Sequence, residues 1–332
     1  MKDLTMSKNF PMDFEQQAAK NPQKEINIAD YIVKASEEFP DSSPILLQGD
    51  VPLLSSGEIS LITGIAKAKK TFLLSWFIAI LLGKKEAEFT NKLQGGILHI
   101  DTEQGRRRTN NVVRRIYRLL NLDFDLSIPN FTALSIRELS AIERFSVLEM
   151  AIKENSYSIV FVDGLADLIR NTNCLEECSR SVSELMRLAE DYNVHICSVV
   201  HTNPNSDKTR GHVGSELQRK CETVMLVKKE GEVSTVSPQF CRNKEFEKFS
   251  FFVNPDSGLP ETCELPNLGT QARDLFTSIF ENLSEIKYGD LCEIVMEKES
   301  VVERTAKRKI SQAVEFRILT KTENGSYSLC KI

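Results

Sequence analysis

A lysine followed by a hydroxyl residue, shortly after a buried apolar run, is the first sign of chemistry in the sequence. With Gly64, the pair Lys70 and Thr71 fits the pattern G-x-x-x-x-G-K-[ST] of phosphate-binding loops. Backbone N–H groups and the helix dipole of such a loop bind phosphate oxygens, the lysine neutralises the β- and γ-phosphates, and the hydroxyl binds Mg²⁺. The predicted nucleotide-binding residues are Gly64, Ile65, Ala66, Lys67, Ala68, Lys69, Lys70, Thr71 and Phe72.

One residue departs from this pattern, because Lys69 stands where the second glycine belongs. If the loop requires a positive φ there, a lysine raises its energy by about 1 kcal/mol or more. The positive charge of the lysine could partly offset this cost when a triphosphate is bound. A lysine-rich turn without a ligand is the alternative interpretation.

Polar residues also follow three further apolar runs. Glu103 and Asp101 follow residues 96–100, Asp163 follows residues 158–162, and His201 follows residues 194–200. Ligands of parallel sheets bind outside the carboxyl ends of the strands, so these side chains are candidates for a site. Helix caps, turns and structural hydrogen bonds are the alternatives for the same residue types.

The elements that must position these residues alternate between short apolar runs and longer segments of helical spacing. Runs so uniformly apolar are typical of strands buried on both faces. Alternation of this kind predicts an α/β fold, namely a doubly wound, mostly parallel sheet with helices on both faces. The expected strands are residues 59–63, 96–100, 158–162, 194–200 and 223–227, and the expected helices are residues 71–83, 107–120, 140–155 and 176–192.

Composition places the chain among ordinary globular proteins. It has 332 residues, 41% of them hydrophobic and 27% charged, with a net charge of −5. The eight cysteines lack zinc-finger spacing and are expected to be reduced thiols. No signal peptide or membrane-spanning run is expected, which predicts a cytoplasmic protein without membrane contact.

Proline content and pattern divide the chain into four predicted parts. Residues 1–44 form a polar arm with one amphipathic helical stretch at 28–39, and residues 45–255 form the core. Residues 233–236 and 248–253 within the core should extend the sheet edge as a hairpin. Residues 256–269 are a linker by composition, and residues 270–332 form a small domain.

The ordered motifs of residues 45–255 resemble those of RecA-like ATPases, specifically RepA-type hexameric helicases and related mobile-element ATPases. The loop is similar to that of a bacterial subgroup reading G-x-x-K-x-x-K-T, which Gly64, Lys67, Lys70 and Thr71 fit. The resemblance implies binding and hydrolysis of ATP. It implies that Glu103 polarises the attacking water, that Asp163 holds Mg²⁺ together with Thr71, and that His201 senses the γ-phosphate. Asp167 is a weaker metal candidate.

The same resemblance implies contacts between subunits and with DNA. Residues 204–215 would line the DNA channel of a ring, although a flexible surface loop has the same composition. Arg242 would complete a neighbour's ATP site, which predicts a homo-oligomer, with a hexamer favoured. A solvated charge pair is the alternative for Arg242. An arginine cluster after Glu103 is expected to be a solvated helix face; it comprises Arg106, Arg107, Arg108, Arg114, Arg115 and Arg118.

The tail resembles a winged helix. Helices are expected over residues 270–283, 289–297 and 302–316, and a wing over residues 318–329. The third of these helices carries a basic face that could enter a DNA groove, although some winged helices bind only proteins. That face consists of Arg304, Lys307, Arg308 and Lys309.

Two functions follow from these expectations. The first is an ATP-driven DNA motor or helicase of replication, recombination or mobile-element transfer, with Lys70, Glu103, His201 and Arg242 as catalytic residues. The second is a nucleotide-switched DNA-binding regulator with little or no ATP turnover. The presence of Lys69 in the loop favours this second hypothesis. The partner in both hypotheses is DNA, single-stranded in a ring channel or duplex at the tail.

Overall fold

The chain folds into two compact units, Met1–Glu264 and Leu265–Ile332. In the computed structural model, the described residues are 27–37, 43–204, 206–265, 268–281, 283–322 and 324–330. Most of the predicted N-terminal arm therefore lies outside the described residues.

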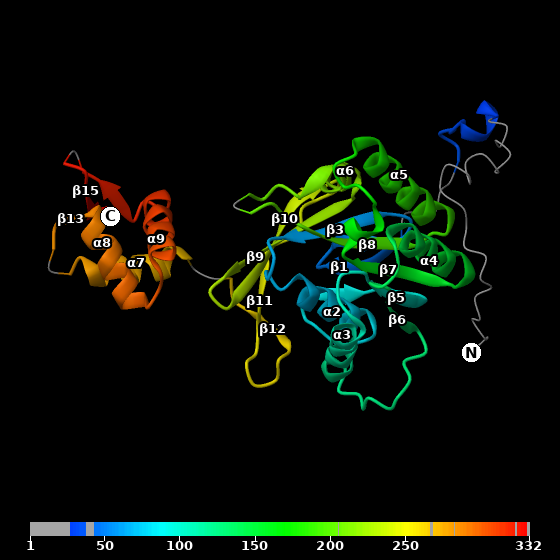
Figure 1. Cartoon of the computed structure of the whole chain (residues 1–332), viewed down its shortest axis with the longest axis horizontal. Helices are drawn as coiled ribbons and strands as arrows, with labels where there is room; N and C mark the ends of the chain where they lie inside the picture. The colour runs from blue at the N-terminus through cyan, green and yellow to red at the C-terminus, as the bar shows by residue number, and fades with distance from the viewer. Residues whose placement is uncertain are drawn as a thin grey trace. The chain divides into compact units, whose positions relative to one another are not determined.

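A large mixed sheet forms the centre of the first unit (Figure 1). Its strand order is β12-β11-β10-β9-β3-β8-β7-β5-β6, and the pairs from β9 to β6 are parallel. The parallel strands are β3 (Ile59–Gly64), β5 (Gly96–Asp101), β6 (Phe131–Ser135), β7 (Tyr157–Asp163), β8 (His195–His201) and β9 (Thr223–Glu230). The expected α/β, mostly parallel, RecA-like arrangement is confirmed.

Helices cover both faces of the sheet because alternate strand residues point to opposite sides. Ile62 of β3 belongs to the core under α2 (Lys70–Leu81) and α3 (Arg106–Leu119). Leu61 belongs to the core on the other face. The helices on that second face are α4 (Ala141–Glu154), α5 (Leu175–Asp191) and α6 (Gly211–Lys220).

Helix α2 is buried on all sides from Leu73 to Leu81. A helix that is apolar all round needs a second apolar surface besides the sheet. A small antiparallel sheet supplies it, and Leu46, Leu53 and Leu54 of that sheet share a core with α2. The small sheet has the order β2-β1-β4, formed by β1 (Pro44–Gln48), β2 (Val51–Ser55) and β4 (Phe89–Asn91).

The sheet edge beyond β9 is antiparallel. Strands β10 (Val233–Cys241) and β11 (Phe249–Val253) pair as the predicted hairpin, and β10 also pairs with β9. The expected linker is corrected in part, because its residues 260–263 form β12 (Pro260–Cys263). Val253 pairs with Pro260 after a turn held by the Asn254 side chain, so the chain returns to the sheet before it leaves it.

Two further expectations are wrong in the described residues. The stretch predicted as a helix at 28–39 contains only the 3-10 turn η1 (Ile28–Tyr31) within residues 27–37. Its apolar side chains are exposed, so no burial stabilises a helix there. The predicted loop 204–215 ends early, because α6 begins at Gly211 and buries Val213 against the sheet.

The second unit contains three helices and a small antiparallel sheet within residues 268–281, 283–322 and 324–330. Its elements are α7 (Leu268–Ile279), β13 (Ile286–Lys287), α8 (Tyr288–Glu299), α9 (Glu303–Glu315), β14 (Leu319–Lys321) and β15 (Ser326–Leu329). β15 lies between β13 and β14. Its core includes Phe276, Leu291, Val295 and Ile310.

Across the residues described, no helix has the length and apolarity needed to cross a membrane.

Candidate nucleotide-binding site

The loop between β3 and α2 is held in an unusual backbone conformation. Lys67 and Lys69 have φ angles of 67° and 71°, in the left-handed region where L-residues are rare. No residue with a side chain fits in place of Gly64, because a Cβ there would lie 2.3 Å from the Val227 carbonyl oxygen of β9. The departure from the sequence pattern at Lys69 therefore stores strain of about 1 kcal/mol.

The Lys69 side chain finds a partner on its own helix. Its Nζ lies 5.1 Å from the centroid of the Phe72 ring, within the range of a cation–π contact. Ala68 is buried, and its carbonyl oxygen accepts a hydrogen bond from Ser234 Oγ at 3.3 Å. The β9–β10 hairpin thus supports the loop from the side.

Lys70 is buried at the start of α2 and bonds to its own loop. Its Nζ donates to the carbonyl oxygens of Gly64 at 2.8 Å and Ile65 at 2.9 Å, and lies 3.0 Å from His201 Nδ1. Burial lowers the pKa of Lys70 to about 8, against the attraction of Asp163 and Glu103. Burial disfavours the charged form of Lys70, and an anion bound beside the ammonium group would stabilise that form.

Thr71 and Asp163 come together as the metal hypothesis requires. Thr71 Oγ1 donates to Asp163 Oδ2 at 2.8 Å. Burial raises the pKa of Asp163 to about 6, against the hydrogen bond from Thr71 and the attraction of Lys70. Hard oxygen ligands of this kind fit Mg²⁺, which takes few protein ligands and completes its shell with water and phosphate.

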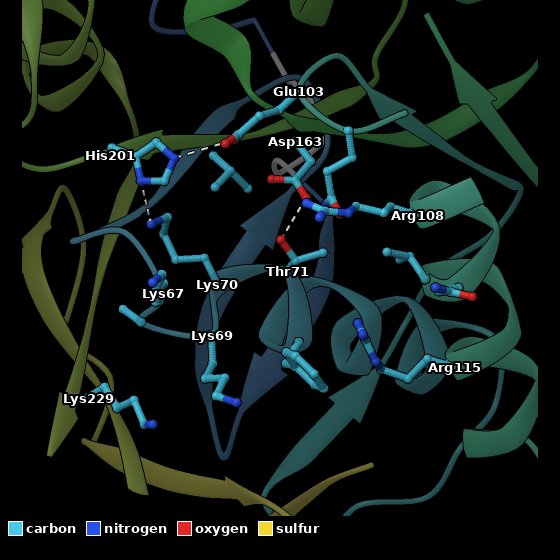
Figure 2. Close-up of a pocket in the computed structure, with 16 residues that line it drawn as sticks. Lys67, Lys69, Lys70, Thr71, Glu103, Arg108, Arg115, Asp163, His201 and Lys229 are labelled. Atoms are coloured by element: carbon cyan, nitrogen blue, oxygen red, sulfur yellow. Dashed lines mark hydrogen bonds and ion pairs between the residues drawn. The ribbon is translucent and has the colours of Figure 1, made fainter. Parts of the chain in front are cut away.

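Glu103 and His201 meet across the mouth of the same cavity (Figure 2). His201 Nε2 lies 3.4 Å from Glu103 Oε2, and this contact is the main reason that the pKa of Glu103 is lowered. Because Lys70 donates to Nδ1, the proton on Nε2 is the one that faces Glu103. Lys70, His201 and Glu103 therefore form one connected chain.

A buried turn places Glu103. Asp101 accepts the backbone N–H groups of Glu103 at 3.2 Å and Gln104 at 2.8 Å, and the Thr109 hydroxyl at 2.9 Å. Asp101 thus orients the turn, and these three hydrogen bonds occupy its carboxylate oxygens. Asp167, the weaker metal candidate, accepts from Thr102 Oγ1 at 3.2 Å and does not line the cavity.

Lys70, Thr71, Glu103, Asp163 and His201 border one cavity of about 690 Å³ at the carboxyl edge of the sheet. Its lining includes the predicted residues Lys67, Ala68, Lys69, Lys70, Thr71, Phe72, Glu103, Asp163 and His201. Gln104, Arg108, Asn111, Val112, Arg115, Val199 and Lys229 complete it. The volume suits a nucleotide-sized ligand.

The arginine cluster after Glu103 is only partly the solvated face that we expected. Arg115 stacks its guanidinium 3.6 Å from the Phe72 ring centroid and donates to Ser75 Oγ at 3.3 Å. Burial lowers its pKa to about 10. Its spacing from Arg108 is two helical turns, and this i, i+7 relation was the available signal for a shared face.

Arg242 lies away from this cavity in its own chain. It follows the end of β10, where Cys241 pairs with Thr223 beside the start of β3. Its Nη1 bonds to both Glu58 carboxylate oxygens at 3.1 Å, and its Nη2 donates to the Lys220 carbonyl oxygen. Gly64 lies at the other end of β3, roughly 15–20 Å away. The predicted role of Arg242 in a neighbour's ATP site stays a prediction.

These features define a P-loop site for a nucleoside triphosphate on a RecA-like sheet. A family model described as AAA domain matches residues 22–207, more than half of the chain. The chain therefore belongs to this family of P-loop ATPases, which implies binding and hydrolysis of ATP with Mg²⁺. No curated protein matches the chain.

Proposed function

We propose that the protein is an ATP-hydrolysing DNA motor similar to the RepA-type helicases. The observation that carries this proposal is the connected chain from Lys70 through His201 to Glu103 beside the Thr71–Asp163 pair. A chain of this kind joins the group that binds phosphate to the group that acts on water. A site that only stored nucleotide would not need the connection.

Each residue has a distinct chemical task in this proposal. Lys70 exchanges its loop carbonyls for phosphate oxygens, and Glu103 accepts a hydrogen bond from the attacking water and orients it. Mg²⁺, held by Thr71 and Asp163, would neutralise charge that develops on the phosphate oxygens. When Lys70 turns to phosphate, His201 loses a partner on Nδ1 and is free to respond to the γ-phosphate.

The segment after His201 offers a route from the nucleotide to DNA. Residues 203, 204 and 206–210 lie between β8 and α6, and Asp207 Oδ2 accepts from Lys228 Nζ at 2.7 Å. Lys228 precedes Lys229, which lines the nucleotide cavity. The segment therefore follows one cavity residue, His201, and contacts through Asp207 the neighbour of another, Lys229. We propose that it contacts single-stranded DNA.

In this proposal the second unit contacts duplex DNA. Its order of helices and strands, with β15 between β13 and β14, supports the winged-helix assignment. On α9, Lys307 pairs with Glu303 at 2.6 Å and Lys309 with Glu299 at 2.9 Å. Pairs this exposed contribute little to stability, so DNA phosphates can replace their carboxylates.

We also propose a ring-shaped homo-oligomer, with a hexamer favoured. For Arg242 of one subunit to reach a neighbour's phosphates, it must leave Glu58, which costs little for an exposed pair. Arginine suits this role because its planar guanidinium bonds two phosphate oxygens at once.

Steady-state ATP hydrolysis with and without single-stranded DNA tests the motor proposal. We expect turnover that rises severalfold with single-stranded DNA and that is absent in Lys70→Ala, the control for contaminating ATPases. Turnover that no nucleic acid stimulates, in a sample that binds ATP, would contradict a DNA motor.

A nucleotide-switched DNA-binding regulator is the second candidate. The strained φ of Lys69 and the three contacts of Lys70, with the Gly64 and Ile65 carbonyls and with His201, favour it, because both oppose a rapid cycle of binding and release. A regulator should protect one defined duplex site in footprinting, in an ATP-dependent manner. A motor should protect none.

A further inference from the structure

The nucleotide cavity contains more positive charge than the P-loop pattern requires. Six cationic side chains line it, against the carboxylates of Glu103 and Asp163. The six are Lys67, Lys69, Lys70, Arg108, Arg115 and Lys229. The negative charge of a triphosphate matches this excess of positive charge. Some of these cationic groups, in addition to Lys70, should therefore contact phosphate.

The two arginines of α3 differ in what they are free to do. Arg115 is fixed by its stack on Phe72 and by its bond to Ser75, so its guanidinium cannot extend further. Arg108, two turns earlier on the same face of α3, is exposed. Among the residues that the structure describes, the Arg108 side chain makes no ion pair and no hydrogen bond. It therefore reaches a ligand without breaking a contact.

The first turn of α3 also carries positive charge, although helix starts favour negative charge. Arg106, Arg107 and Arg108 occupy its first turn, no acidic residue lies there, and the Gly105 N-cap offers no side chain. Three cations at the positive end of a helix dipole each cost about 0.3–1 kcal/mol. An anion bound at this helix end would be attracted both by the helix dipole and by the three arginines.

Figure 2 shows the Arg108 side chain extending from α3 into the cavity, on the side of Thr71 and Asp163. We infer that Arg108 bonds a phosphate oxygen of the nucleotide bound in its own chain, so that each subunit carries its own phosphate-contacting arginine. This inference rests on the proposed function, because it requires a nucleoside triphosphate in the cavity.

The position of Arg242 makes the inference specific. In its own chain Arg242 bonds Glu58 and the Lys220 carbonyl near the amino end of β3. Arg108 instead lines the same cavity as Lys70. An arginine that acts within one chain and an arginine that acts on a neighbour differ in what a mixture of variants can do.

Mixing two inactive variants tests which chain Arg108 serves. Lys70→Ala and Arg108→Ala are assayed for ATP hydrolysis separately and as an equimolar mixture that has been dissociated and reassembled. We expect the mixture to be as inactive as its parts, because no chain contains both residues. Recovery of at least tenfold over either variant would overturn the inference, because it would show that Arg108 acts across subunits.

A binding measurement keeps the inference testable if turnover is slow. Dissociation constants for Mg²⁺–ATPγS and for inorganic tripolyphosphate are measured for the wild type and for Arg108→Ala. We expect both ligands to bind about 10- to 100-fold more weakly to the variant, the size of a lost charge-assisted contact. Arg107→Ala is the matched control, because Arg107 neighbours Arg108 on α3 but does not line the cavity.

The outcomes separate the inference from the proposed function. Unchanged binding in Arg108→Ala, with binding lost in Lys70→Ala, contradicts only the role of Arg108. An equal loss in Arg107→Ala also contradicts it, because a general charge effect then explains the result. A wild type that binds neither ligand contradicts the nucleotide site itself. Arg108→Lys should recover part of the affinity.

Discussion

The two ends of strand β8 each carry a histidine, and the structure uses the two residues in opposite ways. At the carboxyl end, His201 is partly exposed, lies between Lys70 and Glu103, and borders a cavity. At the amino end, His195 is fully buried, and burial lowers its pKa to about 4. Its two ring nitrogens bond to the surrounding protein.

The amino end has residue types that elsewhere perform nucleophilic catalysis. Ser60 Oγ lies 2.8 Å from His195 Nε2, and Glu222 Oε1 lies 3.6 Å from His195 Nδ1. However, His195 Nδ1 donates to the Ser55 carbonyl oxygen at 2.7 Å, and Glu222 accepts the Ser55 N–H at 2.7 Å. Ser60 and His195 are inaccessible to solvent. The network therefore joins β2, β3, β8 and Glu222, the residue that precedes β9.

Solvent access and unused hydrogen-bonding capacity distinguish the functional histidine of β8 from the structural one. His201 and Lys70 can exchange protein contacts for ligand contacts, whereas His195 and Ser60 can only lose theirs. Variants at the carboxyl end should change binding and turnover. Variants at the amino end should change stability.

Replacement of Lys70 by methionine should produce the largest effect at the carboxyl end. We expect the affinity for MgATP to fall by about 100-fold or more, because a charge-assisted phosphate contact is lost. The free energy of unfolding should change by less than about 1 kcal/mol, since removing a buried cation also removes its desolvation cost. Calorimetric titration and denaturant unfolding measure the two quantities. A variant that unfolds far more easily would show that Lys70 also stabilises the fold.

Replacement of His195 by alanine should do the reverse. The free energy of unfolding should fall by about 2–4 kcal/mol, because a cavity forms and buried partners lose hydrogen bonds. The affinity of the folded variant for MgATP should stay within about twofold. A large loss of affinity without loss of stability would show that the amino end takes part in binding.

The Mg²⁺ dependence of ATP binding should decline on the acid side. Asp163 has a pKa raised to about 6 by burial, so it is ionised above that pH and protonated below it. A protonated carboxyl does not bind Mg²⁺, and affinity for MgATP should therefore fall as pH drops through about 6. Asp163→Asn should abolish this pH dependence. Affinity that stays constant between pH 7 and 5 would argue against Asp163 as a ligand.

The smallest effect is expected at Lys69. Glycine at this position should raise the free energy of unfolding by about 1 kcal/mol, because it removes the strain of a left-handed lysine. Loss of the contact with Phe72 should subtract a few tenths of that gain. Thermal unfolding measures the sum. A destabilised Lys69→Gly variant would show that the lysine side chain contributes more than its backbone costs.

The sequence predicted the central elements closely because their residues are uniformly apolar. Strand β8, expected over residues 194–200, spans His195–His201, and α2, expected over 71–83, spans Lys70–Leu81. Polar residues at the carboxyl ends of parallel strands were bound to meet at one edge. The approach of Lys70, Thr71, Glu103, Asp163 and His201 followed from that rule.

Other features depend on contacts that a single segment does not reveal. Strand β6 is only half-buried along its length, so it lacks the apolar signal of its neighbours. Arg115 becomes part of the cavity wall because Phe72 supplies a ring to stack on. Arg242 lies by Glu58 because of the register between β9 and β10, which depends on long-range pairing.

The central claim is that Glu103 acts on water and does not merely complete the fold of the site. Glu103→Gln keeps the size and most hydrogen bonds of the side chain but removes its charge. We expect single-turnover hydrolysis of ATP to slow by about 100-fold or more, while the affinity for MgATP stays within about threefold. Hydrolysis at the wild-type rate would contradict the claim, and so would a loss of binding that accounts for the whole decrease in rate.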